Sequence, residues 1–452
     1  MRKLNILALA VVVALAAAPA FASVQNVRIS GDVDSTYLFR ENFDLGNSAT
    51  NDQQSVFFTQ TRLRVDADLT DQVAATVALI NERVWNSDGG TDTGANTESD
   101  TNVSLYLAYV TLREMLYSPL TVIVGRQDFR YGNSFIFDSA GTNNSAPGDS
   151  GLDGVAEDLT KQTALDAIRF ILDYNPLTIE AFYAAVNQGT VSLADDDDNI
   201  NVWGLVATYE VGDAMNSIVE AYIFDKKDKS EVAGSVDNQT NHIKVLGGRF
   251  STNPLEGLNL QAELAHQSGT NVTTDEQQDR DAWGFQGIAN YQLPVLEEYN
   301  PTLMYVFTKV YGNHQSTSNP DDAYTAWDPF FENQAGGTIY NTLFNLSNAV
   351  IHTLSLSVNP MEDVKTKFSV TKLWTEGELS AGSIGLVQPD GGSASPAGPG
   401  NRELGIELGV DTTYNYTEDV QLGLNVGVFK PSDAFDSDVD AKQVIAHVNV
   451  AF

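Results

Sequence analysis

The sequence predicts an all-β fold, a single transmembrane antiparallel β-barrel of about 18 strands with short periplasmic turns and long extracellular loops. Three features predict it: an export signal, recurring runs of alternating apolar and polar residues, and connections that alternate between short and long. The alternation is clear in the terminal stretch, where Val448 and Phe452 share one parity while His447 and Asn449 share the other. A strand with this period of two has one apolar and one polar face.

The N-terminal segment has the features of a secretory signal peptide. Two basic residues, Arg2 and Lys3, precede the apolar run Leu7–Ala18, and an A-x-A cleavage pattern follows. The apolar run is too short to span a membrane comfortably. We therefore expect residues 1–22 to be a cleaved signal peptide and residues 23–452 to form one barrel domain.

Alternating runs recur along the rest of the chain, separated by turn residues. In one clear hairpin, Leu63–Leu69 turns through residues 70–72 into Val73–Leu79. The full set of expected strands is 27–40, 62–69, 73–79, 102–112, 120–130, 165–174, 177–186, 200–210, 217–224, 242–250, 258–266, 282–292, 302–310, 350–358, 364–374, 404–416, 420–429 and 443–452.

The connections between these strands predict how the barrel sits in a membrane. The even-numbered connections are short and the others are long, which is typical of a barrel with both termini on the periplasmic side. An apolar terminal strand would be an aggregation-prone edge unless it were paired. We therefore expect the first and last strands to pair and close the barrel, so that every backbone group is satisfied in lipid.

Composition excludes several classes of function. The formal net charge is −35, and it becomes −37 when Arg2 and Lys3 leave with the signal peptide. So acidic a chain is a poor candidate for nucleic-acid binding, which needs Lys and Arg for phosphate contacts. The chain has no Cys, so it has neither disulfides nor thiolate metal sites. We expect no cofactor.

The acidic run Asp195, Asp196, Asp197 and Asp198 is a weak candidate for a loop-bound Ca²⁺. It lacks the D-x-D-x-D-G spacing of a dedicated calcium loop, and a solvated, self-repelling loop is the favoured interpretation. On the extracellular side such loops could also join the divalent cations that bridge lipopolysaccharide. The expected partners are outer-membrane lipid and lipopolysaccharide, together with a hydrophilic solute or polysaccharide. Protein partners in the periplasm are a further possibility.

Catalysis is not expected. A barrel hydrolase needs a hydroxyl or carboxylate held beside a His, and none of the five His residues lies in a recognisable nucleophile motif. His447, on the polar parity of the last strand, is the one His that we keep as a candidate. The remaining His residues are expected to fill the lumen or to lie at the membrane interface.

The most specific local motif is Gly125-Arg126-Gln127-Asp128-Phe129-Arg130-Tyr131-Gly132, which follows an apolar run. Together with the signal peptide and the strand pattern, this stretch resembles the alginate-export family of outer-membrane porins. The resemblance implies a monomeric barrel in the outer membrane whose basic lumen passes an anionic polysaccharide. The residues that match the family motif are Arg126, Asp128 and Arg130. Strict alternation would turn Arg126 toward lipid, so either a β-bulge at Gly125 aims it inward or Arg126 lies above the hydrocarbon, and we expect the bulge.

Charged residues expected to face the lumen are candidates for a selectivity-determining wall. They are Arg40, Arg62, Arg64, Arg126, Asp128, Arg130 and Arg169, with Asp66, Asp68, Asp173, Glu180 and Glu263 as further wall residues. The Arg residues cluster in the first third of the barrel, while many acids fall in the long loops. We therefore expect a local basic stripe beneath an acidic mouth, and a weak anion preference. The alternatives are a general, cation-leaning porin and a barrel that sheathes a multihaem electron-transfer partner.

Overall fold

The computed structural model of the protein describes residues 25–45, 53–85, 103–138, 140–147, 150–187, 200–229, 240–272, 277–313, 323–334, 337–377, 402–435 and 439–452. The predicted signal peptide lies outside these residues, as do Asp195 to Asp198. No helix in the described part of the chain is long and apolar enough to cross a membrane.

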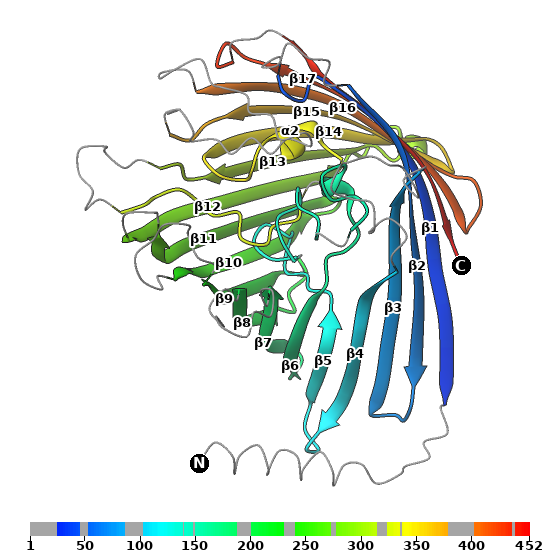
Figure 1. The fold of residues 1–452 in the computed structure, drawn as a ribbon, viewed down its shortest axis with the longest axis vertical. Helices are drawn as coiled ribbons and strands as arrows, with labels where there is room; N and C mark the ends of the chain where they lie inside the picture. Colours follow the sequence, from blue (N-terminus) through cyan, green and yellow to red (C-terminus); the bar gives the residue numbers. More distant parts are fainter. Residues whose placement is uncertain are drawn as a thin grey trace, which may run out of the picture.

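The described chain forms one closed antiparallel sheet of 18 strands (Figure 1). The strands are β1 (Asn26–Glu41), β2 (Gln54–Asp68), β3 (Val73–Val84), β4 (Ser104–Met115), β5 (Leu120–Gln127), β6 (Leu165–Asp173), β7 (Leu177–Asn187), β8 (Ile200–Glu210), β9 (Ile218–Asp228), β10 (Asn241–Leu255), β11 (Leu258–Val272), β12 (Gln277–Gln292), β13 (Thr302–Val310), β14 (Ala349–Met361), β15 (Val364–Trp374), β16 (Glu403–Asn415), β17 (Val420–Pro431) and β18 (Ala441–Ala451). Short helices lie at η1 (Glu157–Leu159), η2 (Glu297–Tyr299) and α2 (Ile339–Leu343). The predicted fold class and strand number are confirmed.

The barrel closes where β1 pairs with β18, as the sequence predicts. The register runs from Asp32 opposite Ala451 to Glu41 opposite Lys442. Gly31 and the terminal Phe452 extend it by exchanging two backbone hydrogen bonds of 2.9 and 3.0 Å. This seam leaves neither terminal strand with an unpaired edge.

Residues on the two faces of the wall alternate as the sequence predicts. On β1, Ile29 is 66% exposed on the outer face, whereas Asp34 and Arg40 point inward and are buried. On β18, Val448 is exposed outward, while Gln443 is buried on the lumen side. The apolar side chains therefore form an outer band that suits lipid, and the polar parity lines the lumen.

Several boundaries differ from the prediction. β10 and β14 continue through Pro254 and Pro360, where turns were expected, and each register shifts just before its actual turn. A proline lacks the N–H of a regular ladder, and an irregularity in the pairing accommodates it. β11 and β12 also extend further toward the mouth than expected.

The expected bulge at Gly125 is wrong, because the pairing of β5 with both β4 and β6 runs through this residue without a shift. Gly125 instead has φ of 125°, and a Cβ atom here would lie 2.1 Å from the carbonyl oxygen of Ala108. Only glycine fits this position. Arg126 avoids the hydrocarbon because it lies near the mouth end of β5, one residue before the strand ends.

Two long connections fold into the barrel instead of extending away from it. We call residues 128–164, between β5 and β6, the first inward loop, and residues 323–348, before β14, the second inward loop. Figure 1 shows both inside the ring of strands. They pair with each other through a parallel bridge between Phe137 and Phe331. Between them they determine how much of the lumen stays open.

Candidate functional site

The first inward loop is held to the wall by Glu82 of β3, a buried carboxylate. Its oxygens accept hydrogen bonds from Gln60 at 2.6 Å, from the hydroxyl of Thr160 at 2.8 Å and from the backbone N–H of Lys161 at 2.7 Å. Ser150 also donates to the same carboxylate. One wall residue therefore fixes the loop at several separate points.

A second anchor joins the same loop to the barrel seam. Arg40 of β1 donates to Asp158 of the loop at 2.6 Å and to Gln443 of β18 at 2.8 Å. The Arg40 and Asp158 side chains are 1% and 3% exposed. A buried pair of this kind is costly to break from one side, because the remaining charge would be left unpaired.

The second inward loop is anchored to the opposite part of the wall and also, through α2, to β16 near the seam. Lys226 of β9 forms an ion pair of 3.0 Å with Asp328, and Gln267 of β11 exchanges two hydrogen bonds with the Asp328 backbone. Burial opposes ionisation of Asp328, but the Lys226 ammonium and the Arg280 guanidinium hold the pKa of that carboxyl below its ordinary value. The carboxylate of Glu407 on β16 accepts the first N–H groups of α2.

The two inward loops are packed together by aromatic side chains. Phe135 stacks on Trp327 with ring centroids 5.8 Å apart, and Phe137 contacts Phe331 at 4.9 Å. Phe137 also contacts Phe182 of the wall at 5.2 Å. These rings belong to one buried cluster that reaches wall residues of many strands. The middle of the barrel is therefore a packed constriction and not an open tube.

The constriction leaves space beside the seam. A cavity of about 260 Å³ lies between Leu159 and Lys161 of the first inward loop and the wall of β1, β2 and β16 to β18. Polar wall residues such as Asp34, Asn425 and His447 line it together with apolar ones such as Phe58 and Ile445. This seam-side space is the best candidate for the pore path.

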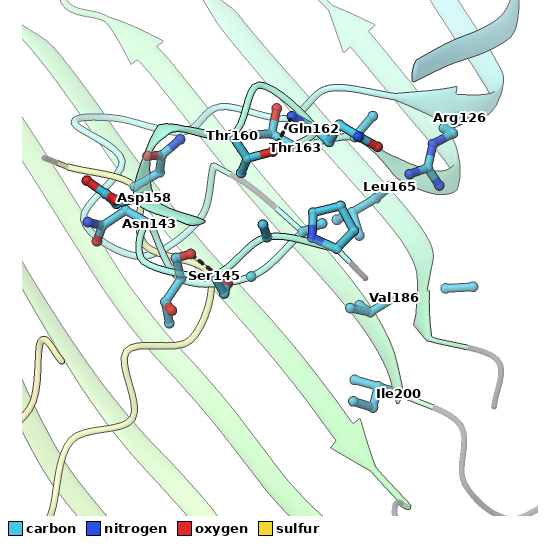
Figure 2. A pocket seen from close by; sticks show the side chains of 18 residues that line it. Arg126, Asn143, Ser145, Asp158, Thr160, Gln162, Thr163, Leu165, Val186 and Ile200 are labelled. Atoms are coloured by element: carbon cyan, nitrogen blue, oxygen red, sulfur yellow. Dashed lines mark hydrogen bonds between the residues drawn. The ribbon is translucent and has the colours of Figure 1, made fainter. Parts of the chain in front are cut away.

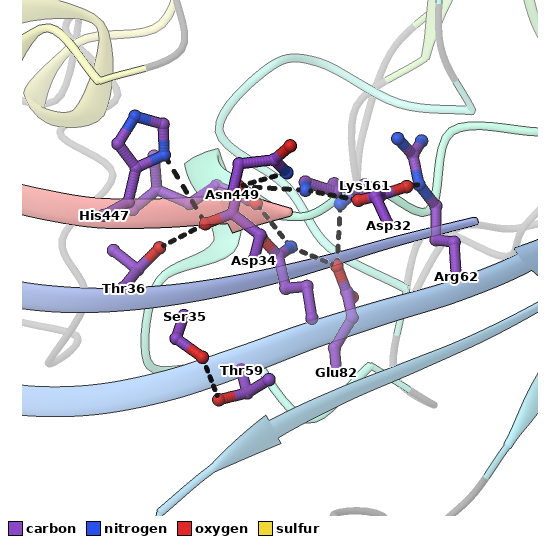
Figure 3. A network of polar contacts seen from close by, with 12 residues as sticks. Asp32, Asp34, Ser35, Thr36, Thr59, Arg62, Glu82, Lys161, His447 and Asn449 are labelled. Carbon is purple, nitrogen blue, oxygen red and sulfur yellow. Dashed lines mark hydrogen bonds and ion pairs between the residues drawn. The ribbon is translucent and has the colours of Figure 1, made fainter. Parts of the chain in front are cut away.

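A charged network borders that space (Figure 3). Lys161 reaches from the loop to Asp32 at 3.1 Å and to Asp34 at 3.0 Å. Asp32 also binds Arg62 at 2.7 Å, and His447 lies 3.4 Å from Asp34. The cations and carboxylates of this network neutralise one another.

Further toward the periplasmic end, the pairs are more exposed. Arg64 makes two hydrogen bonds with Asp66, at 2.7 and 2.9 Å. Beyond the seam, Lys367 of β15 pairs with Asp411 of β16 at 2.8 Å. The lumen below the constriction is thus lined by ion pairs.

The remaining predicted site residues have different surroundings. Arg169 binds Glu180 at 2.7 and 2.8 Å and lies beneath the aromatic cluster, 5.2 Å from the ring centroid of Phe129. Arg126 forms an ion pair of 3.2 Å with Asp166 at the mouth end of β5 and β6.

The two motif residues of the first inward loop also lie apart from the lower wall. Asp128 accepts hydrogen bonds of 2.9 Å from the hydroxyl of Tyr106. Arg130 is exposed on the loop. The structure therefore brings Arg62 and Arg64 together on β2 and pairs Arg64 with Asp66 and Arg169 with Glu180. It places Arg40, Arg126, Asp128 and Arg130 separately.

The acidic-loop calcium candidate is not described by the structure, and it stays a prediction. Among the described residues, no group of three or more His, Asp or Glu side chains could hold a metal ion.

One loop carboxyl has an unusual environment. Glu332, in the second inward loop, is 3% exposed. Burial raises the pKa of Glu332 to about 7, although the backbone N–H groups of Gln334 and Asn143 favour its charged form.

Sequence reasoning missed the residues that build the constriction, notably Glu82, Lys161 and the loop aromatics. One signal could have found them. Phe135-Ile136-Phe137 and Phe330-Phe331 lie in stretches expected to be water-exposed loops. Consecutive large apolar residues in such a loop indicate that it packs against something.

Comparisons with known proteins agree with this architecture. The sequence profile of the alginate export family matches residues 26–449. No curated protein matches the chain. Among solved structures, Pseudomonas aeruginosa OccK2 (OpdF) in complex with glucuronate has a TM-score of 0.57 at 10% identity, covering 95% of this chain and 98% of its own.

Two further porin structures have the same fold. Pseudomonas aeruginosa OpdL has a TM-score of 0.56 at 13% identity, covering 94% of this chain and 99% of its own. A BenF-like porin from Pseudomonas fluorescens Pf-5 has a TM-score of 0.56 at 13% identity, covering 95% and 99%. With an alternating wall, a closed seam and a family match over nearly its whole length, this chain belongs to the alginate export family and is an integral outer-membrane channel for solutes.

Proposed function

We propose that the channel passes hydrophilic solutes that carry carboxylate groups, and that uronate sugars or short uronate oligomers are the leading candidates. The observation that carries this proposal is the unequal exposure of the ion pairs beside and below the constriction. Arg62 is 35% exposed and its partner Asp32 is 13% exposed, while Arg64 is 42% exposed and Asp66 is 25% exposed. A passing anion therefore meets the cation of each pair first.

The preference should be weak. Each exposed cation has a carboxylate within hydrogen-bond distance, so the field of the pair falls off quickly with distance. Charges in the loops are screened within about 8 Å at physiological salt, so they affect approach more than passage. The family description and the glucuronate bound to the OccK2 porin support a uronate over other carboxylates.

Swelling of proteoliposomes tests this proposal directly. The solutes are sodium glucuronate, neutral glucose and cationic glucosamine, which have similar size. We expect glucuronate to enter faster than glucosamine, and the double variant Arg62→Gln with Arg64→Gln to remove the difference. Arg113→Gln, exposed near the periplasmic end of β4, is the matched control. Faster entry of glucosamine in the wild type would refute the proposal.

A cation-leaning porin is the second candidate, and the net charge of −35 favours it. The same swelling measurement separates it from the first.

A sheath for a multihaem partner would need an open lumen, whereas the chain's own loops fill the middle of this barrel. A hydrolase would need a hydroxyl at Nε2 of His447, but a Cβ atom added to Gly423 would lie 1.8 Å from that nitrogen, so glycine packs against it.

A further inference from the structure

The two faces of the barrel wall meet different surroundings at the mouth end. On the inside, a cavity of about 420 Å³ lies between the first inward loop and the ends of β6 to β8, where Figure 2 shows Asn143, Val186 and Ile200 around it. This cavity is on the solute side of the wall. The outer face of the wall meets lipid instead, and on β15 to β18, which are neighbours in the sheet (Figure 1), it carries a cluster of lysines.

Three lysines point outward at the mouth end of these strands, and we call them the outer lysine cluster. They are Lys372 of β15, Lys430 of β17 and Lys442 of β18, and all three side chains are well exposed. Their neighbours along the chain point into the barrel and are almost fully buried, among them Leu373, Phe429 and Ala441. Because side chains alternate between the two faces of a strand, each lysine lies on the lipid side of the wall.

The strand register places the three lysines close together. Lys372 and Lys430 lie opposite Ile406 of β16, one on each side of it, which puts their backbones about 10 Å apart. Lys442 is opposite Val428, so it is the diagonal neighbour of Lys430, about 7–8 Å away. Three positive charges at this spacing repel one another unless anions lie beside them.

The chain's own carboxylates neutralise the outer lysine cluster only in part. Lys372 lies 3.1 Å from Glu403, and Lys442 lies 3.3 Å from Glu41. Both carboxylates are themselves partly exposed, and ion pairs at a water-accessible surface contribute little to stability. Lys430 forms no ion pair with the part of the chain that the structure describes. One charge is therefore open, and the other two can exchange their partners at little cost.

The outer lysine cluster lies at the level of the membrane–water interface. The ammonium group of Lys372 is 4.9 Å from the ring centroid of Trp374, and Trp is the residue type that is enriched at this level. Below the lysines the outward positions are aliphatic and exposed, as at Val370, Leu408 and Val426. This arrangement offers cations to a head group and an apolar surface to acyl chains.

The opposite end of the same outer face has different chemistry. Its outward positions near the periplasmic turns hold Tyr414, Leu422 and Val450. The lysines of this face thus lie at the end that contacts the outer leaflet. The lipid that they suit is one of that leaflet, with phosphate groups at the interface and several acyl chains below.

We propose that the outer lysine cluster binds lipopolysaccharide, with the lysines on the phosphates of its lipid A and the apolar face of β15 to β18 against its acyl chains. Hydrogen bonds from an ammonium group to a phosphate are charge-assisted, and groups of lysines at a membrane surface bind anionic head groups. Lys442 and Glu41 face each other across the seam of β18 and β1. The bound lipid therefore lies against the strand pair that closes the barrel, whatever solute the channel passes.

Titration of the detergent-purified channel with bisphosphorylated lipid A, followed by native mass spectrometry, measures this binding. The triple variant Lys372→Gln, Lys430→Gln and Lys442→Gln should lose affinity about tenfold, the loss expected for a hydrogen bond to a charged group. Its affinity for lipid A without phosphates should equal that of the wild type. Heat-modifiable gel migration checks that the triple variant folds, and Lys430→Gln alone should give a smaller loss in the same direction.

The matched control removes three exposed cations from the periplasmic end of the barrel, by Arg28→Gln, Arg113→Gln and Lys365→Gln, and should bind like the wild type. Equal affinity of the wild type and the lysine variants for bisphosphorylated lipid A would overturn the proposal. Equal affinity of the wild type for lipid A with and without phosphates would overturn it too. Binding of inorganic pyrophosphate as tight as that of the lipid would show a free-phosphate site and refute the lipid as its ligand.

Discussion

At the scale of single residues, Glu82 has an unusual set of partners for a buried carboxylate. It accepts several hydrogen bonds from neutral donors of the first inward loop and from Gln60 on the neighbouring strand. Its role is to hold the loop against the wall, because its oxygens bind Ser150 before η1 and both Thr160 and Lys161 after it. Glu82 of β3 is thus one of the side chains that position the constriction, together with Arg40 of β1.

Replacing this carboxylate should loosen the loop. Glu82→Ala leaves several buried donors without an acceptor, and each costs about 1–3 kcal/mol. We expect a lower temperature of heat-modifiable unfolding in gels and a larger, noisier single-channel conductance. Glu362→Ala, exposed in the β14–β15 turn, should behave like the wild type. Unchanged unfolding and conductance in Glu82→Ala would show that the loop is held elsewhere.

Glu332 gives a second residue-scale prediction. Its pKa is about 7 in the folded protein, above the ordinary value of 4.5. The folded state therefore keeps a proton that the unfolded state releases, and stability should fall as pH rises between about 4.5 and 7. The full effect of a shift of this size is about 3 kcal/mol. Thermal unfolding in detergent from pH 4.5 to 8 measures it.

Glu332→Gln imitates the protonated carboxyl and should make this pH dependence weaker. It should also be more stable than the wild type at pH 8. Identical pH profiles for the wild type and Glu332→Gln would contradict the assignment of the raised pKa to this residue.

At the scale of elements, the strands and the inward loops differ in how far the sequence predicts them. A strand face follows from local alternation, so the inward direction of Asp34 and Arg62 could be read from parity alone. The loops follow contacts distant in sequence, such as Ser150 with Glu82, 68 positions apart. Parity contains no information on such pairs.

The residues of the candidate site also differ in whether the sequence predicts them. Arg62, Arg64 and Arg169 could be assigned to the lumen wall from the sequence. The sequence does not predict which carboxylates these Arg residues and Lys161 bind, because each ion pair depends on strand register or on the path of a loop. The prediction for Arg126 is wrong for another reason. The backbone conformation of Gly125 cannot be inferred from an alternating sequence pattern.

Aromatic packing between the inward loops supports an element-scale prediction. Phe137 is fully buried between the loops and the wall. Phe137→Ala should leave a cavity and cost about 3–5 kcal/mol. We expect the loops to separate and single-channel conductance to rise, with little change in the strand content measured by circular dichroism. Leu116→Ala, 83% exposed in a periplasmic turn, is the control. Unchanged conductance would mean that the loops do not form the constriction.

At the scale of the whole molecule, the charge of the chain and the charge of its pore are separate properties. The net charge is −35, yet the described lumen wall below the constriction is lined by matched ion pairs whose Arg members are the more exposed. Composition therefore describes the surroundings of the channel, while the position of a few side chains determines what passes. The barrel positions these side chains, and the inward loops narrow the path beside them.

The reversal potential in a planar bilayer under a KCl gradient tests this account most directly. The account predicts a weak anion preference for the wild type, lost in the double variant Arg62→Gln with Arg64→Gln and kept in Arg113→Gln. A cation preference in the wild type that the double variant leaves unchanged would contradict it.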